Sequence, residues 1–445
     1  MWKSFSENTR FSYRLPECPK AWKRKKAGWK PALSLKRRKS TMPPPSTNSS
    51  RNGKKKYLLL LLLLLLLAAA FYSFFRWFIK TETSPKTILQ SQTNHPKGGI
   101  SEGPVQVRGR KLYVDGKPYL IKGVGYHPVP IGKGPGFNFL QRPEIWKRDL
   151  PLLRKMGCNT IRLWAGTPPR EFLDACWNDG RKPIRVVMGF WIPYDVDLSE
   201  PGNRKRLKRR FAEFVLHYKD HPAVLFWALG NENNYFYTAS MLKDFYKFCN
   251  ELAYMAWKAE GERYHPVAIV NGGLFAHKGF WRPGGEVGEE KNGTDDTSLK
   301  YIDIWGANLY PGKHLTDIFH RYERASKKPL WVSEFGVDAW NSRRGRTQET
   351  EQARWTLTLW RDIAHSKIAI GGTVMAWSDE WWKDSNGSPF THDYGGYANP
   401  RGHPDGYSNE EWYGIMETIA DPSGLDRLRP RKLYYVLAKE WNRSS

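Results

Sequence analysis

The sequence predicts an α/β fold, a (β/α)8 barrel of the TIM type, preceded by a short β-hairpin and an N-terminal transmembrane helix. Between residues 119 and 382, eight continuous apolar runs alternate with segments that mostly show helical periodicity. Apolar runs separated by helices are typical of parallel strands that are covered on both faces. Eight such units within about 250 residues is the repeat number of a closed barrel.

The elements can be placed in order along the chain. The stretch "VQVRGRKLYVDGKPYL" alternates in polarity and turns at Asp115-Gly116, which indicates a hairpin. The alternative fold is a doubly wound open sheet, but "GVGYHP" after the first strand lacks the glycine-rich turn of a dinucleotide site. Strands are expected within 119–127, 159–165, 184–192, 223–232, 266–273, 302–312, 329–337 and 369–382, and helices within 144–157, 169–180, 204–220, 241–261, 315–327, 348–367 and 428–441.

The segment before the barrel has a different composition. Residues 1–56 carry +15 of the formal net charge of +27 and are rich in Ser, Pro and Lys, which predicts a disordered basic tail. Residues 57–79 contain ten consecutive leucines, Leu58 to Leu67, and the apolar stretch continues to Phe75. A helix of this length nearly spans a hydrocarbon core of about 30 Å. Because the run begins far from the N-terminus, we expect an uncleaved signal anchor rather than a cleaved signal peptide.

The basic flank of this helix predicts a single-pass type II orientation, with the tail in the cytosol. Residues 80–103 are then a polar stem, and residues 104–445 form a lumenal or extracellular domain of the secretory pathway or cell surface. Three glycosylation sequons, at Asn292, Asn386 and Asn442, agree with that placement. Beyond the anchor there are three cysteines, which allow at most one bridge, and we expect packed free thiols.

Polar and aromatic residues gather where the predicted strands end, which is the end of a (β/α)8 barrel that binds ligands. The run "AVLFWALGNENN" stops at Asn231 and Glu232, and "PLWVSEFGV" carries Glu334. A lone carboxylate at a strand end is usually solvated or caps a helix. Two glutamates on nearly opposite sides of one barrel predict a catalytic pair. The other candidates at strand ends are Tyr126, His127, Arg162, Trp191, Asn308, Tyr310 and Trp377. For four of them, His127, Arg162, Trp191 and Tyr310, a packed structural role is the alternative.

The motifs "GNE" and "SEFG" resemble the paired signatures of clan A retaining β-glycoside hydrolases. The order of "KLYVDGKPYLIKGVGYHP", "RPEIWKRDLPLLRKMGCNTIRLWA", "FWALGNENN", "IDIWGANLY" and "VSEFG" is similar to the β-1,3-glucanosyltransferases of glycoside hydrolase family 72. The barrel of glycoside hydrolase family 2 is similar at "VDGKPYLIKG", "HPAVLFWALGNE", "KPLWVSEFGVDA" and "MAWSDEW". The likeness covers roughly residues 105–440 and rests on the order of the motifs.

The resemblance implies that Glu232 is the acid/base and Glu334 the nucleophile of a double displacement. It also implies that Asn231 binds the sugar 2-hydroxyl and that Trp377 forms the floor of the −1 subsite. Arg162 and Tyr310 are expected to orient Glu334 by hydrogen bonds. Tyr126, His127, Trp191 and Asn308 are expected to line the substrate site.

The sequence therefore predicts a membrane-anchored retaining β-glycoside hydrolase or transglycosylase that acts on a β-linked polysaccharide, most readily β-1,3-glucan. Another β-glycosidase of the clan, such as a β-mannanase, and a catalytically inert carbohydrate-binding barrel are the alternatives. No cofactor, metal or obligate protein partner is expected. A nucleic-acid-binding role is disfavoured, because the predicted anchor separates the basic tail from the folded domain.

Overall fold

A computed structural model of the chain describes residues 101–275, 286–383, 388–393 and 396–443. The predicted basic tail, the signal anchor and all but the last three residues of the predicted stem lie outside these ranges, as does the sequon at Asn386. Within the described part, no helix is long and apolar enough to cross a membrane.

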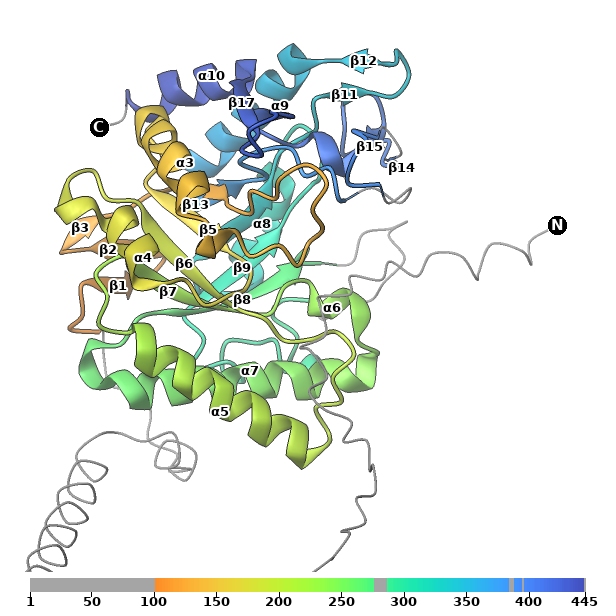
Figure 1. Cartoon of the computed structure of the whole chain (residues 1–445). Helices are drawn as coiled ribbons and strands as arrows, with labels where there is room; N and C mark the ends of the chain where they lie inside the picture. The colour runs from red at the N-terminus through yellow and green to blue at the C-terminus, as the bar shows by residue number, and fades with distance from the viewer. Residues whose placement is uncertain (1–100, 276–285, 384–387, 394–395, 444–445) are drawn as a thin grey trace, which may run out of the picture. The chain divides into compact units, whose positions relative to one another are not determined.

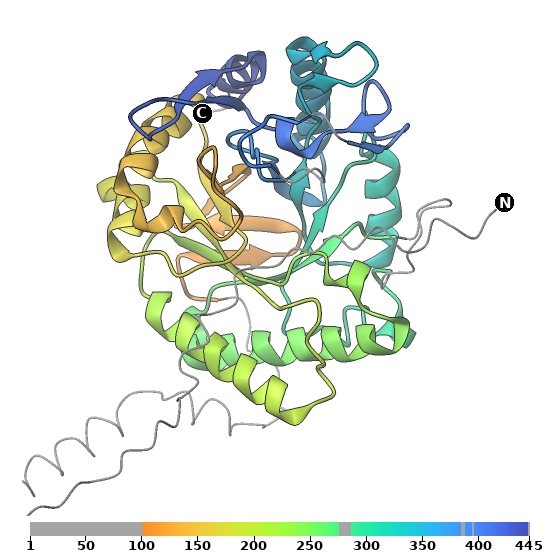
Figure 2. The ribbon, with the colours of Figure 1, turned by 45° about the vertical axis from the view of Figure 1, so that its right-hand side comes forward.

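Eight parallel strands close into a barrel, in the order β10-β13-β4-β5-β6-β7-β8-β9. Helices surround the strands (Figures 1 and 2), so the predicted (β/α)8 architecture is confirmed. The barrel strands are β4 (Ile121–Gly125), β5 (Thr160–Leu163), β6 (Arg185–Phe190), β7 (Val224–Leu229), β8 (Val267–Gly272), β9 (Ile304–Asn308), β10 (Leu330–Phe335) and β13 (Ala369–Val374).

The α-helices follow the predicted order, and most of their long apolar side chains join one large buried cluster with the outward-facing residues of the strands. Between β8 and β9 the described chain has only a 3-10 turn, as the loop-rich sequence there predicts. The helices are α3 (Pro143–Met156), α4 (Arg170–Trp177), α5 (Pro201–Tyr218), α6 (Asn233–Phe236), α7 (Ala239–Glu260), α8 (Thr316–Ala325), α9 (Glu349–Ala364) and α10 (Lys432–Trp441).

The predicted hairpin is part of a three-stranded antiparallel sheet of β1 (Val105–Arg108), β2 (Lys111–Val114) and β3 (Lys117–Pro118). The turn between β2 and β3 uses Asp115 and Gly116 with φ of 51° and 75°, as a tight hairpin turn requires. Val105, Leu112 and Val114 of this sheet belong to the same packed cluster as the residues inside the barrel. The sheet therefore covers one end of the barrel interior.

The segments that follow β10 and β13 contain short antiparallel strand pairs. These are β11 (Trp340–Asn341) with β12 (Arg346–Thr347), β14 (Tyr397–Ala398) with β15 (Tyr407–Ser408), and β16 (Met416–Ile419) with β17 (Arg427–Pro430). The three cysteines of the described part, Cys158, Cys176 and Cys249, are buried free thiols, as expected.

A buried ion pair joins the segment after β13 to the C-terminal part of the chain. Arg431 and Asp379 are both 0% exposed, and the two guanidinium nitrogens donate to the two carboxylate oxygens at 2.5 and 2.6 Å. Arg431 directly precedes α10, which packs on α9 and α3. The sequence around Asp379 gives no sign of this burial, because the partner lies 52 residues further along the chain.

We predict that Arg431→Met lowers the free energy of unfolding by about 3–5 kcal/mol, because it leaves a buried carboxylate without its counter-charge. Burial already raises the pKa of Asp379, and Arg431 opposes that rise. Urea denaturation, monitored by tryptophan fluorescence, measures the loss in free energy of unfolding. The double variant Asp379→Leu/Arg431→Met should recover at least half of it, and no recovery would assign the loss to packing rather than charge.

Candidate active site

The site is built where β7 ends and the chain reverses. All six residues of β7 are buried, and Gly230 follows with φ of 65°. Glu232 also adopts a left-handed backbone conformation, with φ of 54° and ψ of 21°, at the start of α6. Non-glycine residues seldom adopt this conformation, and it persists only where the surrounding structure holds it. The turn presents Asn231 and Glu232 at the carboxyl end of the barrel.

Two asparagines with no predicted role hold this turn in place. The backbone N–H of Asn231 donates to Asn233 Oδ1 at 3.0 Å, and Asn233 Nδ2 donates to the carbonyl of Ile192 at 2.9 Å. Asn234 accepts from the N–H of Gly272 at 2.8 Å and donates to the same residue's carbonyl at 3.2 Å. The "NENN" sequence is therefore pinned to the ends of both neighbouring strands, β6 and β8.

Glu334 lies on β10, is 7% exposed, and accepts three hydrogen bonds. Arg162 Nη1 donates to Oε1 at 2.8 Å, Trp164 Nε1 donates to the same oxygen at 2.9 Å, and the Tyr310 hydroxyl donates to Oε2 at 2.9 Å. The predicted hydrogen bonds from Arg162 and Tyr310 are thus present. Three donors on two oxygens fix the carboxylate in one orientation.

Asn308 connects the two glutamates. Its Nδ2 donates to Glu232 Oε1 at 2.9 Å and to Asn231 Oδ1 at 3.2 Å. Its Oδ1 accepts from Arg162 Nη1 at 3.3 Å and from the Ser333 hydroxyl at 2.8 Å. Arg162 Nη2 also donates to Asn231 Oδ1 at 2.7 Å. The structure therefore brings Arg162, Asn231, Glu232, Asn308 and Glu334 into one hydrogen-bonded network.

The electrostatics of this network raise the pKa of the Glu232 carboxyl group. Burial, followed by the negative charge of Glu334, raises the pKa of Glu232 from 4.5 to about 7, and the hydrogen bond from Asn308 opposes the rise. A carboxyl group with this pKa holds a proton near neutral pH and can release it. Burial and the Glu334 carboxylate raise the pKa of Tyr310 well above 10, so its hydroxyl remains a donor.

Two other predicted residues lie near the network. The ring of Trp191 packs on Tyr194 at a centroid distance of 5.0 Å, and the Tyr194 hydroxyl accepts from Asn231 Nδ2 at 3.4 Å. The ring of His127 lies 6.5 Å from that of Trp164, which contacts Glu334. Their contacts with a substrate stay predictions.

Tyr126 and Trp377 are placed elsewhere, which corrects the prediction that they line the substrate. Both are 0% exposed and belong to the large cluster between barrel and helices. The Tyr126 hydroxyl donates to Asp149 of α3 at 3.1 Å. From the end of β13 it is Met375, two residues before Trp377, that packs with Trp164 and Tyr310 beside Glu334.

Sequence reasoning gave no definite role to Trp164, and it missed Tyr194 and Phe236. Gly125 makes room for Trp164, because a Cβ at that glycine would lie 2.5 Å from the indole. Tyr194 stacks on Phe236 of α6 at 3.9 Å and 23°, and Phe236 is 39% exposed. An aromatic surface thus flanks the side of the site that carries Glu232. The position of Phe236, four residues after Glu232, was the available indication.

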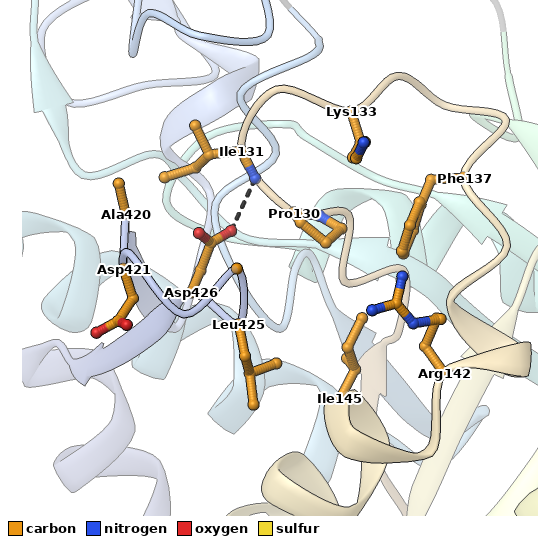
Figure 3. Close-up of a pocket in the computed structure, with 11 residues that line it drawn as sticks. Pro130, Ile131, Lys133, Phe137, Arg142, Ile145, Ala420, Asp421, Leu425 and Asp426 are labelled. Carbon is orange, nitrogen blue, oxygen red and sulfur yellow. Dashed lines mark hydrogen bonds between the residues drawn. The ribbon is translucent and has the colours of Figure 1, made fainter.

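A separate pocket lies between the segment after β4 and the loop joining β16 to β17 (Figure 3). There the N–H of Ile131 donates to Asp426 Oδ2 at 2.7 Å. Its lining shares no residue with the network around the two glutamates. Among the described residues, no group of three or more His, Cys, Asp or Glu side chains is arranged to hold a metal ion.

A (β/α)8 barrel with paired glutamates at the ends of β7 and β10 is typical of glycoside hydrolases. The family model described as "Glycosyl hydrolases family 2, TIM barrel domain" matches residues 105–357. The chain belongs to this family. The predicted likeness to the family 2 barrel and the predicted enzyme class are confirmed at this level, whereas the likeness to family 72 stays a prediction.

Individual relatives are distant. The chain is 24% identical to "Beta-glucuronidase" of Mus musculus over 265 residues, 57% of this chain and 36% of the relative. It is 22% identical to "Beta-galactosidase" of Photobacterium profundum over 193 residues, 42% of this chain and 17% of the relative. The chain therefore spans about a third or less of the length of these curated relatives.

Solved structures show the same fold. The "GH2 beta-galacturonidase from Eisenbergiella tayi bound to galacturonate" superposes with a TM-score of 0.53 at 17% identity, covering 76% of this chain and 54% of that one. The "Faecalibacterium prausnitzii Beta-glucuronidase" gives 0.52 at 20% identity, covering 77% and 52%.

We predict that Glu232→Gln stabilises the folded protein increasingly as pH rises from 4.5 to 7. In this window the folded state keeps the Glu232 proton and the unfolded state loses it, so ionisation lowers the free energy of unfolding of the natural chain. Gln cannot ionise, and its carbonyl still accepts from Asn308. Urea titrations at several pH values measure the difference. Glu351→Gln, a surface change on α9, is the control and should show no such trend.

Proposed function

We propose that this protein is a retaining β-glycosidase in which Glu334 is the nucleophile and Glu232 the acid/base. One observation carries the proposal: a partly buried carboxyl group with a pKa of about 7 shares a hydrogen-bond network with a carboxylate oriented by three donors. Different environments for two carboxyl groups allow one to give a proton while the other attacks. Membership of a glycosyl hydrolase family supports the same assignment.

In the first step, a Glu334 oxygen bonds to the anomeric carbon while the bond from that carbon to the leaving oxygen breaks. Glu232 gives its proton to that oxygen, so the leaving group departs as an alcohol. In the second step, Glu232 takes a proton from water or a sugar hydroxyl, which attacks the anomeric carbon and releases Glu334. Asn231, held by Arg162 and Asn308, is proposed to donate to the 2-hydroxyl of the sugar.

For the substrate, we propose a β-linked polysaccharide, with β-1,3-glucan first among those to test. The surface formed by Trp191, Tyr194 and Phe236 beside Glu232 supports this proposal, because aromatic faces pack on the C–H faces of sugars and would hold an acceptor. A held acceptor favours transfer over hydrolysis. The second candidate is removal of single terminal sugars, which the names of the relatives, a β-glucuronidase and a β-galactosidase, favour.

The test of the catalytic pair uses 2,4-dinitrophenyl and methyl β-glycosides. Glu334→Gln should lower kcat by at least about 10⁴-fold on both. Glu232→Ala should lower kcat/KM about 10²–10⁴-fold on the methyl glycoside, whose leaving group needs protonation, and far less on the dinitrophenyl glycoside. Azide should then restore the turnover of the dinitrophenyl glycoside by Glu232→Ala and give a β-glycosyl azide as product. Equal losses on both substrates without azide rescue would contradict the acid/base role of Glu232.

The choice between transfer and hydrolysis is tested with β-1,3-gluco-oligosaccharides. Products longer than the donor, absent in Glu334→Gln, are expected if the aromatic surface holds an acceptor. Replacing Phe236 by Ala should then lower the ratio of transfer to hydrolysis about tenfold or less, since a sugar–aromatic contact contributes on the order of 1 kcal/mol. Only shorter products from the unaltered protein would contradict transfer.

We also propose a type II membrane topology, with the barrel lumenal or extracellular. The ten leucines Leu58 to Leu67 after a basic segment support it, and the sequon asparagine Asn442 is exposed at the end of α10. In sealed microsomes the barrel should resist added protease and carry glycans removable by endoglycosidase. A barrel digested in sealed vesicles would contradict this topology.

A further inference from the structure

A second group of charged side chains stands beyond the carboxyl ends of β13 and β4. Lys383 Nζ lies 2.7 Å from Glu380 Oε2, and His127 Nδ1 lies 3.1 Å from Glu380 Oε1. The side chains of Glu380 and Lys383 are 3% and 8% exposed. We call Glu380, Lys383 and His127 the rim cluster.

The rim cluster is connected to the nucleophile. His127 packs near Trp164, which donates to Glu334. In the ring of eight strands, β13 is next to β10, which carries Glu334, and opposite β7, which precedes Glu232. The leaving group must stand beside the acid, so the sugar attacked by Glu334 extends away from Glu232. That direction leads to the ends of β13 and β4.

The positive charge of Lys383 is already compensated by neighbouring carboxylates. Burial alone would lower the pKa of Lys383, but the carboxylates of Glu380, Glu410 and Glu334 outweigh it and raise the pKa. Burial likewise opposes ionisation of Glu380, yet Lys383 and His127 lower its pKa. The Lys383 ammonium group is therefore paired with Glu380 at 2.7 Å, and the charges of Glu410 and Glu334 also stabilise its protonated form.

We propose that the rim cluster binds hydroxyl groups of a neutral glycon and excludes a uronic acid, an inference that rests on the proposed glycosidase function. A sugar hydroxyl can donate to Glu380 and accept from Lys383 without changing the charge. A uronate would bring a fourth carboxylate to an ammonium already paired at 2.7 Å. Like charges in a site of low solvent access repel strongly, so the uronate is rejected.

The first test compares 4-nitrophenyl β-D-glucoside, β-D-galactoside, β-D-mannoside and β-D-glucuronide on the full-length protein in detergent. We expect kcat/KM for the best neutral glycoside to exceed that for the glucuronide at least 100-fold. A glucuronide cleaved as well as the neutral sugars would overturn the inference and leave the glycosidase proposal standing.

The second test changes the charge balance. Glu380→Gln should lower the preference for the neutral glycoside over the glucuronide at least tenfold, because it leaves Lys383 able to pair with a uronate. Lys383→Met should weaken neutral substrates and keep the glucuronide excluded. Glu351→Gln, the same chemical change on the outer face of α9, should leave the preference unchanged. An equal loss on all substrates in Glu380→Gln would show a merely structural role and overturn the inference.

A third measurement separates the two proposals. Intact-mass spectrometry follows labelling of Glu334 by 2-deoxy-2-fluoro-β-D-glucosyl fluoride and by the corresponding glucuronyl fluoride. Labelling by the neutral reagent at a rate at least 100-fold higher supports both proposals. Equal rates overturn the exclusion of uronates alone. No labelling by either reagent, with no turnover of any glycoside, overturns the glycosidase function and the inference with it.

Discussion

The candidate site depends on one buried cation. The guanidinium group of Arg162 is 1% exposed at the end of β5, and it donates to Glu334, to Asn231, to Asn308 and to the carbonyl of Ser333. These partners come from the ends of β10, β7 and β9, so one side chain ties four strands together. A buried charge is tolerated only when it is paired and fully hydrogen-bonded. The hydrogen bond from Arg162 therefore fixes the position of the Glu334 carboxylate.

The position of Glu232 has a different origin. Its backbone is left-handed, and the turn that holds this conformation is fixed by the amides of Asn233 and Asn234 to the neighbouring strands. A conformation that is costly by itself persists because its surroundings determine it. The consequence is a carboxyl group that is held half-buried beside Glu334, and it is this placement that raises its pKa.

Much of this arrangement could be predicted from the sequence, because buried parallel strands give unbroken apolar runs and glutamates at their ends stand out. The register of a single side chain could not. Near a strand end, a shift of one or two residues decides whether a side chain faces the open end of the barrel or the helix layer. The sequence therefore predicted Trp377 at the position beside Glu334 that Met375 occupies. For the same reason it predicted Tyr126 at the substrate, although Tyr126 packs against the helices. Partners distant along the chain could not be predicted either. The buried Asp379 carboxylate is neutralised by Arg431, 52 residues later, and accepts from the N–H groups of Gly414 and Thr418.

Asn308 shows how the network can serve both steps of a double displacement. Its Oδ1 accepts from Arg162 and the Ser333 hydroxyl, so its amide group must face Glu232 and Asn231. Asn308 therefore always donates a hydrogen bond to Glu232, which favours the ionised carboxylate. Burial and the charge of Glu334 have the opposite effect and raise the pKa of Glu232. When Glu334 forms an ester with the sugar in the proposed mechanism, its charge disappears and one cause of the raised pKa disappears with it. The Asn308 donor then acts with less opposition, and Glu232 becomes the base that the second step needs.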